Sequence, residues 1–224
     1  MKKAIKVFGI LTLMIFSFYY TEKVALYAQD NTALKKEILT FKENNKVPSV
    51  NAKIDGDYIV PGLDGLEINV NKSYDNMKLR NVFNENELVY NVIHPNISIN
   101  KYPDKIIISG NLYKKAVSII INDNALETIS YFNNNNIKYY KLDRNEFCIL
   151  IDNNCSNILR KVKPSVILNN NNFLRNIDLI KNGDIVYIEE ELLEKYLYVL
   201  IKQINYTNLQ ILDLNDHLSE NNNI

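Results

Sequence analysis

The chain of 224 residues contains little histidine and little cysteine: His94, His217, Cys148 and Cys155 are all that it has. A bound zinc ion needs three or four nitrogen, sulfur or oxygen ligands, and neither an HxxxH nor an HExxH spacing is present. The sequence therefore offers no clustered metal ligands, and we expect a surface or packing role for each histidine. The two cysteines leave open either a disulfide or two unrelated thiols.

Several sequence motifs of known chemistry are absent as well. No GxGxxG, P-loop or GxSxG pattern occurs, so nucleotide binding and serine hydrolysis have no support. The 26 basic residues are balanced by 26 acidic residues, which argues against nucleic-acid binding through net positive charge. Hydrophobic residues make up 46%, enough to bury a core and to argue against general disorder. The 36 asparagines accompany abundant Ile, Lys and Tyr, which is typical of an AT-rich genome.

The N-terminus has the pattern of a secretory signal. Three lysines within residues 1–6 precede an uncharged, mostly apolar run over 7–20. Because Leu26 and Ala28 form a mediocre cleavage site, we expect an uncleaved signal anchor over 1–28, although the run is shorter than about 20 residues. The lysines would then stay in the cytoplasm, and a single-pass protein would expose its C-terminal part outside the membrane. A cleaved, secreted form and a buried helix of a soluble protein are the alternatives.

The rest of the chain divides into three segments by pattern. Residues 29–46 predict a helical stalk, since Leu34, Ile38 and Phe41 share one helix face. Residues 47–110 predict a small β-rich module with a turn at 61–65. Its expected elements are strands at 58–60, 66–70, 88–93, 96–100 and 105–109, and a short helix at 72–78.

Residues 111–224 alternate between strand and helix patterns. Such alternation implies parallel strands joined by right-handed crossovers, in an open sheet or a partial barrel. The fold class is therefore α/β, with a barrel-like parallel sheet in this segment. We expect strands at 116–121, 137–142, 146–151, 165–168, 184–188 and 209–212, and helices at 124–133, 153–161, 172–181, 189–205 and 215–219.

Acidic residues and one asparagine follow several of these strands, at the ends where sites form in α/β folds. Carboxylates gathered at one mouth bind a cation or act as acid and base. The same residues are also good helix caps, which leaves both interpretations open. The residues concerned are Asn122, Asp123, Asp143, Asp152, Glu189 and Glu190.

The last segment resembles the polysaccharide deacetylase (NodB-homology) family. Residues 182–188 (NGDIVYI), a long helix, and residues 209–214 (LQILDL) are similar to the final strands and helices of that family. Residues 116–125 (AVSIIINDNA) stand where the family has a strand ending in Asp-Asp-Gly, and 136–143 (NIKYYKLD) where it has ATFF. Residues 51–110 resemble a module that precedes such domains in membrane-anchored members from low-GC bacteria. The resemblance implies a distorted (β/α)7 barrel, here truncated.

The catalytic residues match less well than the strands do. The family holds its metal with one Asp and two His; Asp123 matches the Asp, and Asn122 occupies the other acidic position. Glu189 stands where the last catalytic His is expected, and no His lies between positions 94 and 217. The resemblance thus implies a degenerate member in which Asn122, Asp123, Asp143 and Glu189 are vestigial, with no cofactor.

Two further residues bear on the same comparison. The resemblance implies that the segment carrying the metal-binding histidines is deleted, because Asp143 is followed closely by Phe147, which begins a strand resembling the family's Arg-bearing motif. That strand has no Arg, and Arg144 lies just before it.

Three functions remain open from the sequence. The first is a membrane-anchored, extracellular, inactive deacetylase-like protein of the cell envelope, which binds peptidoglycan, another envelope glycan or an envelope protein. The second is a divergent active carbohydrate deacetylase that uses Asp123 with Asp143 or Glu189 and a divalent metal such as zinc. The third is a structural scaffold without affinity for glycan. The sequence indicates no oligomeric state.

Overall fold

The computed structural model describes residues 2–30, 32–144, 146–151 and 159–222. The chain forms two compact units, one of Met1–Pro48 and Leu66–Val92 and the other of Ser49–Gly65 and Ile93–Ile224. The sequence pattern predicts boundaries after residues 28, 46 and 110, whereas each unit combines segments that are distant along the chain. We describe the two units separately.

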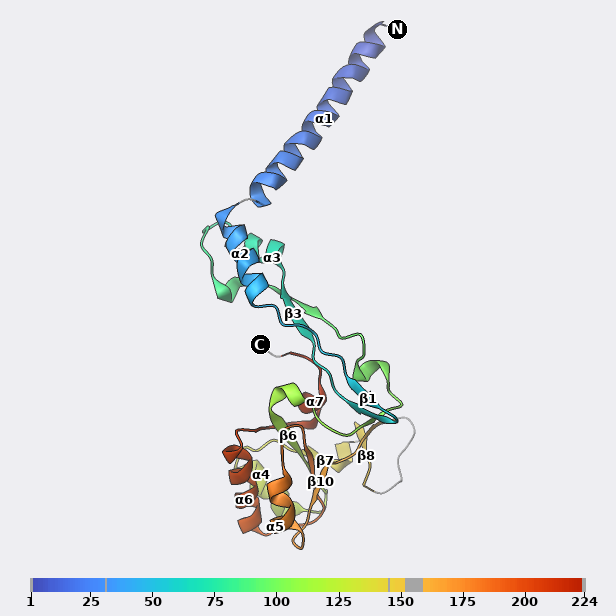
Figure 1. The fold of residues 1–224 in the computed structure, drawn as a ribbon, viewed down its shortest axis with the longest axis vertical. Helices are drawn as coiled ribbons and strands as arrows, with labels where there is room; N and C mark the ends of the chain where they lie inside the picture. The colour runs from blue at the N-terminus through green and yellow to red at the C-terminus, as the bar shows by residue number, and fades with distance from the viewer. Residues whose placement is uncertain (1, 31, 145, 152–158, 223–224) are drawn as a thin grey trace. The chain divides into compact units, whose positions relative to one another are not determined.

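The expected signal anchor falls on helix α1, Lys2–Asp30, which is drawn in blue in Figure 1. When the described residues are searched for a helix with the length and apolar character needed to span a bilayer, none is found.

Helix α2, Ala33–Asn44, belongs to the first unit and packs against helix α3, Val70–Met77. Thr32 caps α2, since its hydroxyl accepts a hydrogen bond of 3.2 Å from the Lys35 amide. Leu34 and Ile38 lie on one face and are buried with Ile68 and Met77. The helix predicted over the expected stalk is thus confirmed. Its apolar face packs against α3 and forms part of a small core.

The remaining elements of the first unit surround this core. Strands β3, Gly65–Ile68, and β4, Tyr90–Ile93, form a two-stranded sheet, and a short 3-10 turn, η1, spans Glu85–Glu87. The Asn69 side chain caps α3 by accepting a hydrogen bond from Lys72.

The second unit contains a parallel sheet in the order β10, β11, β6, β12, with β7 also paired to β6. Every residue of β6 is buried, which confirms the buried central strand that the apolar run predicts. The strands are β6, Ala116–Ile121; β7, Tyr140–Lys141; β10, Val166–Leu168; β11, Ile185–Ile188; and β12, Gln210–Leu212.

Alternate residues of β6 face two different cores. Val117, Ile119 and Ile121 pack among residues of helices α4, Leu126–Asn134, α5, Phe173–Asn176, and α6, Glu194–Tyr206. Figure 1 shows these helices beside the sheet. Ile120 points the other way, into a core that it shares with Tyr140 and Tyr187. Side chains alternate along a strand, so one apolar run supplies both cores.

A second sheet of the same unit has the order β1, β2, β5, β9, β8. The β1 and β2 strands are antiparallel, and the other pairs are parallel. Because Ile107 of β5 is paired with Val162 of β9, strands expected in a separate β-rich module share a sheet with the α/β segment. The strands are β1, Lys53–Asp55; β2, Tyr58–Val60; β5, Ile106–Ile107; β8, Phe147–Ile149; and β9, Arg160–Val162.

The α/β class is confirmed, while the described strands form separate sheets and not one closed barrel. One predicted strand is wrong, and one predicted helix is wrong only at its end. The strand expected at 96–100 is a 3-10 turn, η2, Ile99–Lys101, because the Ser98 hydroxyl accepts from the Asn100 amide and closes the turn. The helix expected at 153–161 lies mostly outside the described residues, and its end is part of strand β9. Further 3-10 turns are η3, Leu112–Lys114, η4, Leu142–Arg144, and η5, Ile177–Leu179; the last helix is α7, Leu214–Leu218.

Candidate functional site

Asn122 directly follows β6 and ties the end of that strand to β11. Its side-chain amide donates to the Glu189 carbonyl oxygen at 3.2 Å and to the Tyr187 hydroxyl at 3.3 Å. Its side-chain oxygen accepts from the Asn124 amide at 3.2 Å. The donors and the acceptor of this side chain are therefore all used in hydrogen bonds within the protein. A carboxylate at this position would have no hydrogen to donate to the Glu189 carbonyl.

The acidic candidates do not form one described cluster with Asn122. The exposed Glu189 carboxylate accepts from the Asn169 side chain at 3.0 Å, so it points toward the loop after β10. Asp123 is half-buried, directly after Asn122. Asp143 lies in the 3-10 turn η4, its side chain outside the described part of the structure, and Asp152 lies outside the described residues altogether.

The capping alternative also fails for the glutamates. Helix α6 begins at Glu194 without a side-chain cap, several residues after Glu189 and Glu190. Glu190 instead accepts from the Asn170 amide at 2.9 Å. Within the described residues, no group of three or more His, Cys, Asp or Glu side chains is placed to hold a metal ion. The described residues thus assemble no metal-ligand set at this edge.

The two histidines occupy contrasting places in the second unit. His94 is exposed, and its Nδ1 lies 3.0 Å from a carboxylate oxygen of the buried Asp64. His217 is buried, its Nδ1 lies 3.1 Å from the Ser118 hydroxyl, and its Nε2 has no hydrogen-bond partner among the described residues. Burial, together with the nearby Lys114 charge, lowers the pKa of His217 to about 4. His217 is thus a neutral packing residue, as its sequence position predicts.

Two other residues considered in the sequence also have structural roles. Arg144 donates to the Asp213 carboxylate at 2.9 Å and lies over the Tyr140 ring. Cys148 is buried in β8 and is disulfide-bonded, while Cys155 lies outside the described residues. Neither Arg144 nor Cys148 is left available for chemistry.

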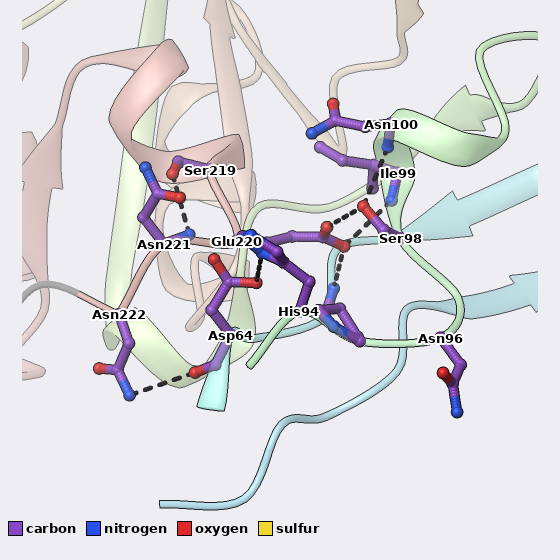
Figure 2. A network of polar contacts seen from close by, with 12 residues as sticks. Asp64, His94, Asn96, Ser98, Ile99, Asn100, Ser219, Glu220, Asn221 and Asn222 are labelled. Carbon is purple, nitrogen blue, oxygen red and sulfur yellow. Dashed lines mark hydrogen bonds and ion pairs between the residues drawn. The ribbon is translucent and has the colours of Figure 1, made fainter. Parts of the chain in front are cut away.

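A polar network that the sequence did not predict surrounds Glu220, near the end of the chain (Figure 2). The buried Glu220 carboxylate accepts from the Gly62 amide at 2.9 Å, from the Ile99 amide at 3.0 Å and from the Ser98 hydroxyl. Its backbone oxygen accepts from the Asp64 amide at 2.7 Å. Sequence separations above 120 residues explain why no local signal marked this carboxylate.

Gly62 is required at this network by close packing. A Cβ atom at this position would lie 2.2 Å from the Val50 carbonyl oxygen, a contact that backbone atoms cannot relieve. The turn predicted at 61–65 is wrong, because Leu63 pairs with Val50 in an antiparallel bridge and Gly65 begins β3. Gly62 is needed for the close approach of the Val50 backbone and not for a positive φ.

A cavity of about 530 Å³ lies beside this network. It is bounded by the η2 turn, by the first residues of β8 and β9, and by the residues that follow α7. Arg160, the first residue of β9, contributes the guanidinium group.

A second hollow of about 810 Å³ is lined by residues of α4, α6 and β12 and of the segments next to them. Tyr131 and the exposed Tyr198 supply aromatic rings, and Asn205 and Gln210 supply amides. Aromatic faces and amide groups together are the side chains that suit a sugar ring, since one stacks and the other forms hydrogen bonds.

Comparisons with known proteins agree with the fold but reach only part of the way to a function. No protein-family model matches the chain. The uncharacterized protein YlxY of Bacillus subtilis (strain 168) is 33% identical over 90 residues, which is 40% of this chain. The match spans 28% of the length of YlxY.

Crystal structures of BA3943 from Bacillus anthracis, a CE4 family pseudoenzyme, are similar to this chain. The wild-type structure has a TM-score of 0.54 at 15% identity and covers 86% of this chain and 97% of its own. A mutant of BA3943 with restored enzymatic activity has a TM-score of 0.55 at 15% identity, covering 84% of this chain and 99% of its own. At this identity the likeness establishes a shared fold, which agrees with the deacetylase-like α/β pattern of the sequence.

Proposed function

We propose that this chain is an extracellular, membrane-anchored protein with a deacetylase-like fold that binds an envelope glycan and does not hydrolyse it. The observation that carries the proposal is that the side chains of Asn122 and Glu189 already form hydrogen bonds with neighbouring loops. A metal-activated water needs several ligands aimed at one point, and the described residues supply no such group. Inactivity is also supported by the similarity in fold to a pseudoenzyme.

Glycan binding is proposed for the hollow over α4 and α6. Tyr198 is 60% exposed on α6, and Tyr131 approaches the same hollow from α4. Stacking of a sugar ring on an exposed tyrosine removes apolar area from water, at about 25 cal/mol per Å². The amides of Asn205 and Gln210 lie within the same hollow and supply donors and acceptors for hydroxyl groups.

The test is co-sedimentation of the full chain with purified peptidoglycan and with chitin. We expect binding that falls at least threefold in Tyr198→Ala. Tyr206→Ala is the matched control, because Tyr206 is an exposed tyrosine of the same helix that does not line the hollow. Equal losses in the two variants would move the binding site elsewhere, and no sedimentation of the native chain would favour a scaffold without glycan affinity.

A further inference from the structure

The cavity beside Glu220 is lined by Arg160, whose guanidinium has two donors without a hydrogen-bond partner among the described residues. Nε and Nη2 of Arg160 are buried, and neither has a hydrogen-bond partner in the part of the chain that the structure describes. Leaving a buried polar group unpaired is unfavourable, and more so for a charged group. These two nitrogens lie on the same edge of the guanidinium plane. Their N–H groups run parallel, which is the spacing that a carboxylate accepts in a bidentate pair.

Glu220, an acidic residue of the cavity wall, does not pair with these two nitrogens of Arg160. Both oxygens of Glu220 already accept hydrogen bonds, from the Gly62 and Ile99 amides and from the Ser98 hydroxyl. Burial lowers the pKa of Arg160, while the charges of Glu220 and Asp104 raise it. A guanidinium stays protonated through such shifts, so the free edge remains cationic.

Lys101, the other cation of the cavity wall, is turned to the backbone. Its ammonium donates to the carbonyl oxygens of Asn96 at 2.9 Å and of Pro95 at 3.3 Å. Arg160 is therefore the cation of this cavity whose donors are left over for an anion.

The rest of the wall favours an organic body on that anion. Ile99, Ile107, Phe147 and Leu218 give the cavity an apolar side, and its volume of about 530 Å³ is in the range of small-molecule sites. Inorganic phosphate would leave this apolar side in contact with water. We propose that the cavity binds a small organic carboxylate, whose two oxygens accept from Nε and Nη2 of Arg160.

This proposal is independent of the proposed function. The cavity lies at the first residues of β8 and β9, whereas Asn122 and Glu189 follow the last residues of β6 and β11, and the tyrosine hollow lies over α4 and α6. Failure of glycan binding would leave the carboxylate site untouched, and the reverse also holds.

The chain has only four arginines, which makes the test direct by NMR of the arginine Hε–Nε groups in the full chain in a zwitterionic detergent. The probe is phenylacetate, and the comparison compounds are the neutral phenylacetamide and inorganic phosphate. We expect a saturable shift of the Arg160 resonance with phenylacetate and at least tenfold weaker responses to the other two. No shift, or an equal shift with phenylacetamide, would overturn the proposal. A response to phosphate as strong as that to phenylacetate would refute an organic ligand.

Variants give a second, independent readout. Arg160→Gln removes the charge and Arg160→Lys keeps the charge but removes the planar fork, so both should weaken phenylacetate binding at least tenfold. Arg175→Gln is the matched control, because Arg175 is an exposed arginine outside the cavity. Unchanged affinity in the Arg160 variants would contradict the assignment. If those variants do not fold, the NMR titration of the native chain still decides.

Discussion

Two polar regions of the second unit differ in how their side chains are satisfied. After β6 and β11, Asn122 and Glu189 are held by hydrogen bonds to neighbouring loops. At the beginning of β9, Arg160 is half-buried, and two buried nitrogens of its side chain have no partner among the described residues. The edge where the sequence places vestigial chemistry is therefore held by hydrogen bonds of its own loops, whereas the donors without a partner among the described residues lie at a cavity that no sequence motif marks.

Among the substitutions that test this comparison, we expect the largest loss of stability at Glu220, whose hydrogen bonds hold the cavity wall. Glu220→Ala leaves two amides and one hydroxyl without their acceptor, and should lower the free energy of unfolding by about 4 kcal/mol. Glu220→Gln should lose only about 1 kcal/mol, because its amide oxygen still accepts from Gly62 and Ile99. Urea unfolding followed by circular dichroism measures both, with the exposed Glu43→Ala as control.

If Glu220→Ala were as stable as the control, the network would not hold the cavity together, and the contrast between the two regions would lose its structural basis.

A second buried nitrogen to compare with those of Arg160 is Nε2 of His217. It has no hydrogen-bond partner among the described residues and, unlike Arg160, His217 does not line the cavity beside Glu220. Its pKa is about 4 in the folded chain and about 6.5 when unfolded, so the unfolded chain binds the proton first as pH falls. The stability is complete above pH 6.5 and declines by about 3 kcal/mol by pH 4. Urea unfolding across this range should be flatter in His217→Gln than in the native chain. Parallel slopes in His217→Gln and the native chain would disprove this role.

Gly110 probes the packing around the same imidazole. A Cβ at Gly110 would lie 2.1 Å from atoms of the His217 ring, so Gly110→Ala should cost about 2 kcal/mol through overpacking. Combining Gly110→Ala with His217→Ala should recover part of that loss, since the clash is removed. Strictly additive losses in thermal unfolding would show that the two positions do not interact.

The smallest expected effect concerns Asn122, the residue that would carry an acid in an active relative. Asn122→Asp removes the donations to the Glu189 carbonyl and the Tyr187 hydroxyl and should cost about 1 kcal/mol. It should not create deacetylase activity, because no histidine lies between positions 94 and 217. Asn124→Asp at the adjacent exposed position is the control. Metal-dependent acetate release by Asn122→Asp would break the comparison.

The local periodicity of the sequence predicts most elements but not how distant ones combine. The apolar run of 116–121 identifies the central strand, since only a strand covered on both faces has that pattern. The pairing of Ile107 with Val162 joins segments assigned to different modules, and no local pattern encodes such a long-range contact. The NISIN segment alternates as a strand does, yet the Ser98 side chain favours a turn.

The candidate site was predictable only in part. The resemblance to deacetylases directs attention to Asn122 and Glu189, which follow β6 and β11, but their side-chain partners come from Asn169 and from a backbone group of another loop. Arg160 was missed because the comparison sought an arginine in β8, and the nearest one in sequence, Arg144, pairs with Asp213. Glu220 gave no signal, since its partners are more than 120 residues away.

The most direct test of the central claim is acetate release from N-acetylated chitooligosaccharides and peptidoglycan fragments by the full chain, with zinc or cobalt supplied. We predict no release above the rate of the chain treated with a chelator, although the same glycans are bound. Acetate release that depends on the metal and disappears in Asp123→Asn would contradict the account, because it would require a ligand set that the described residues do not form.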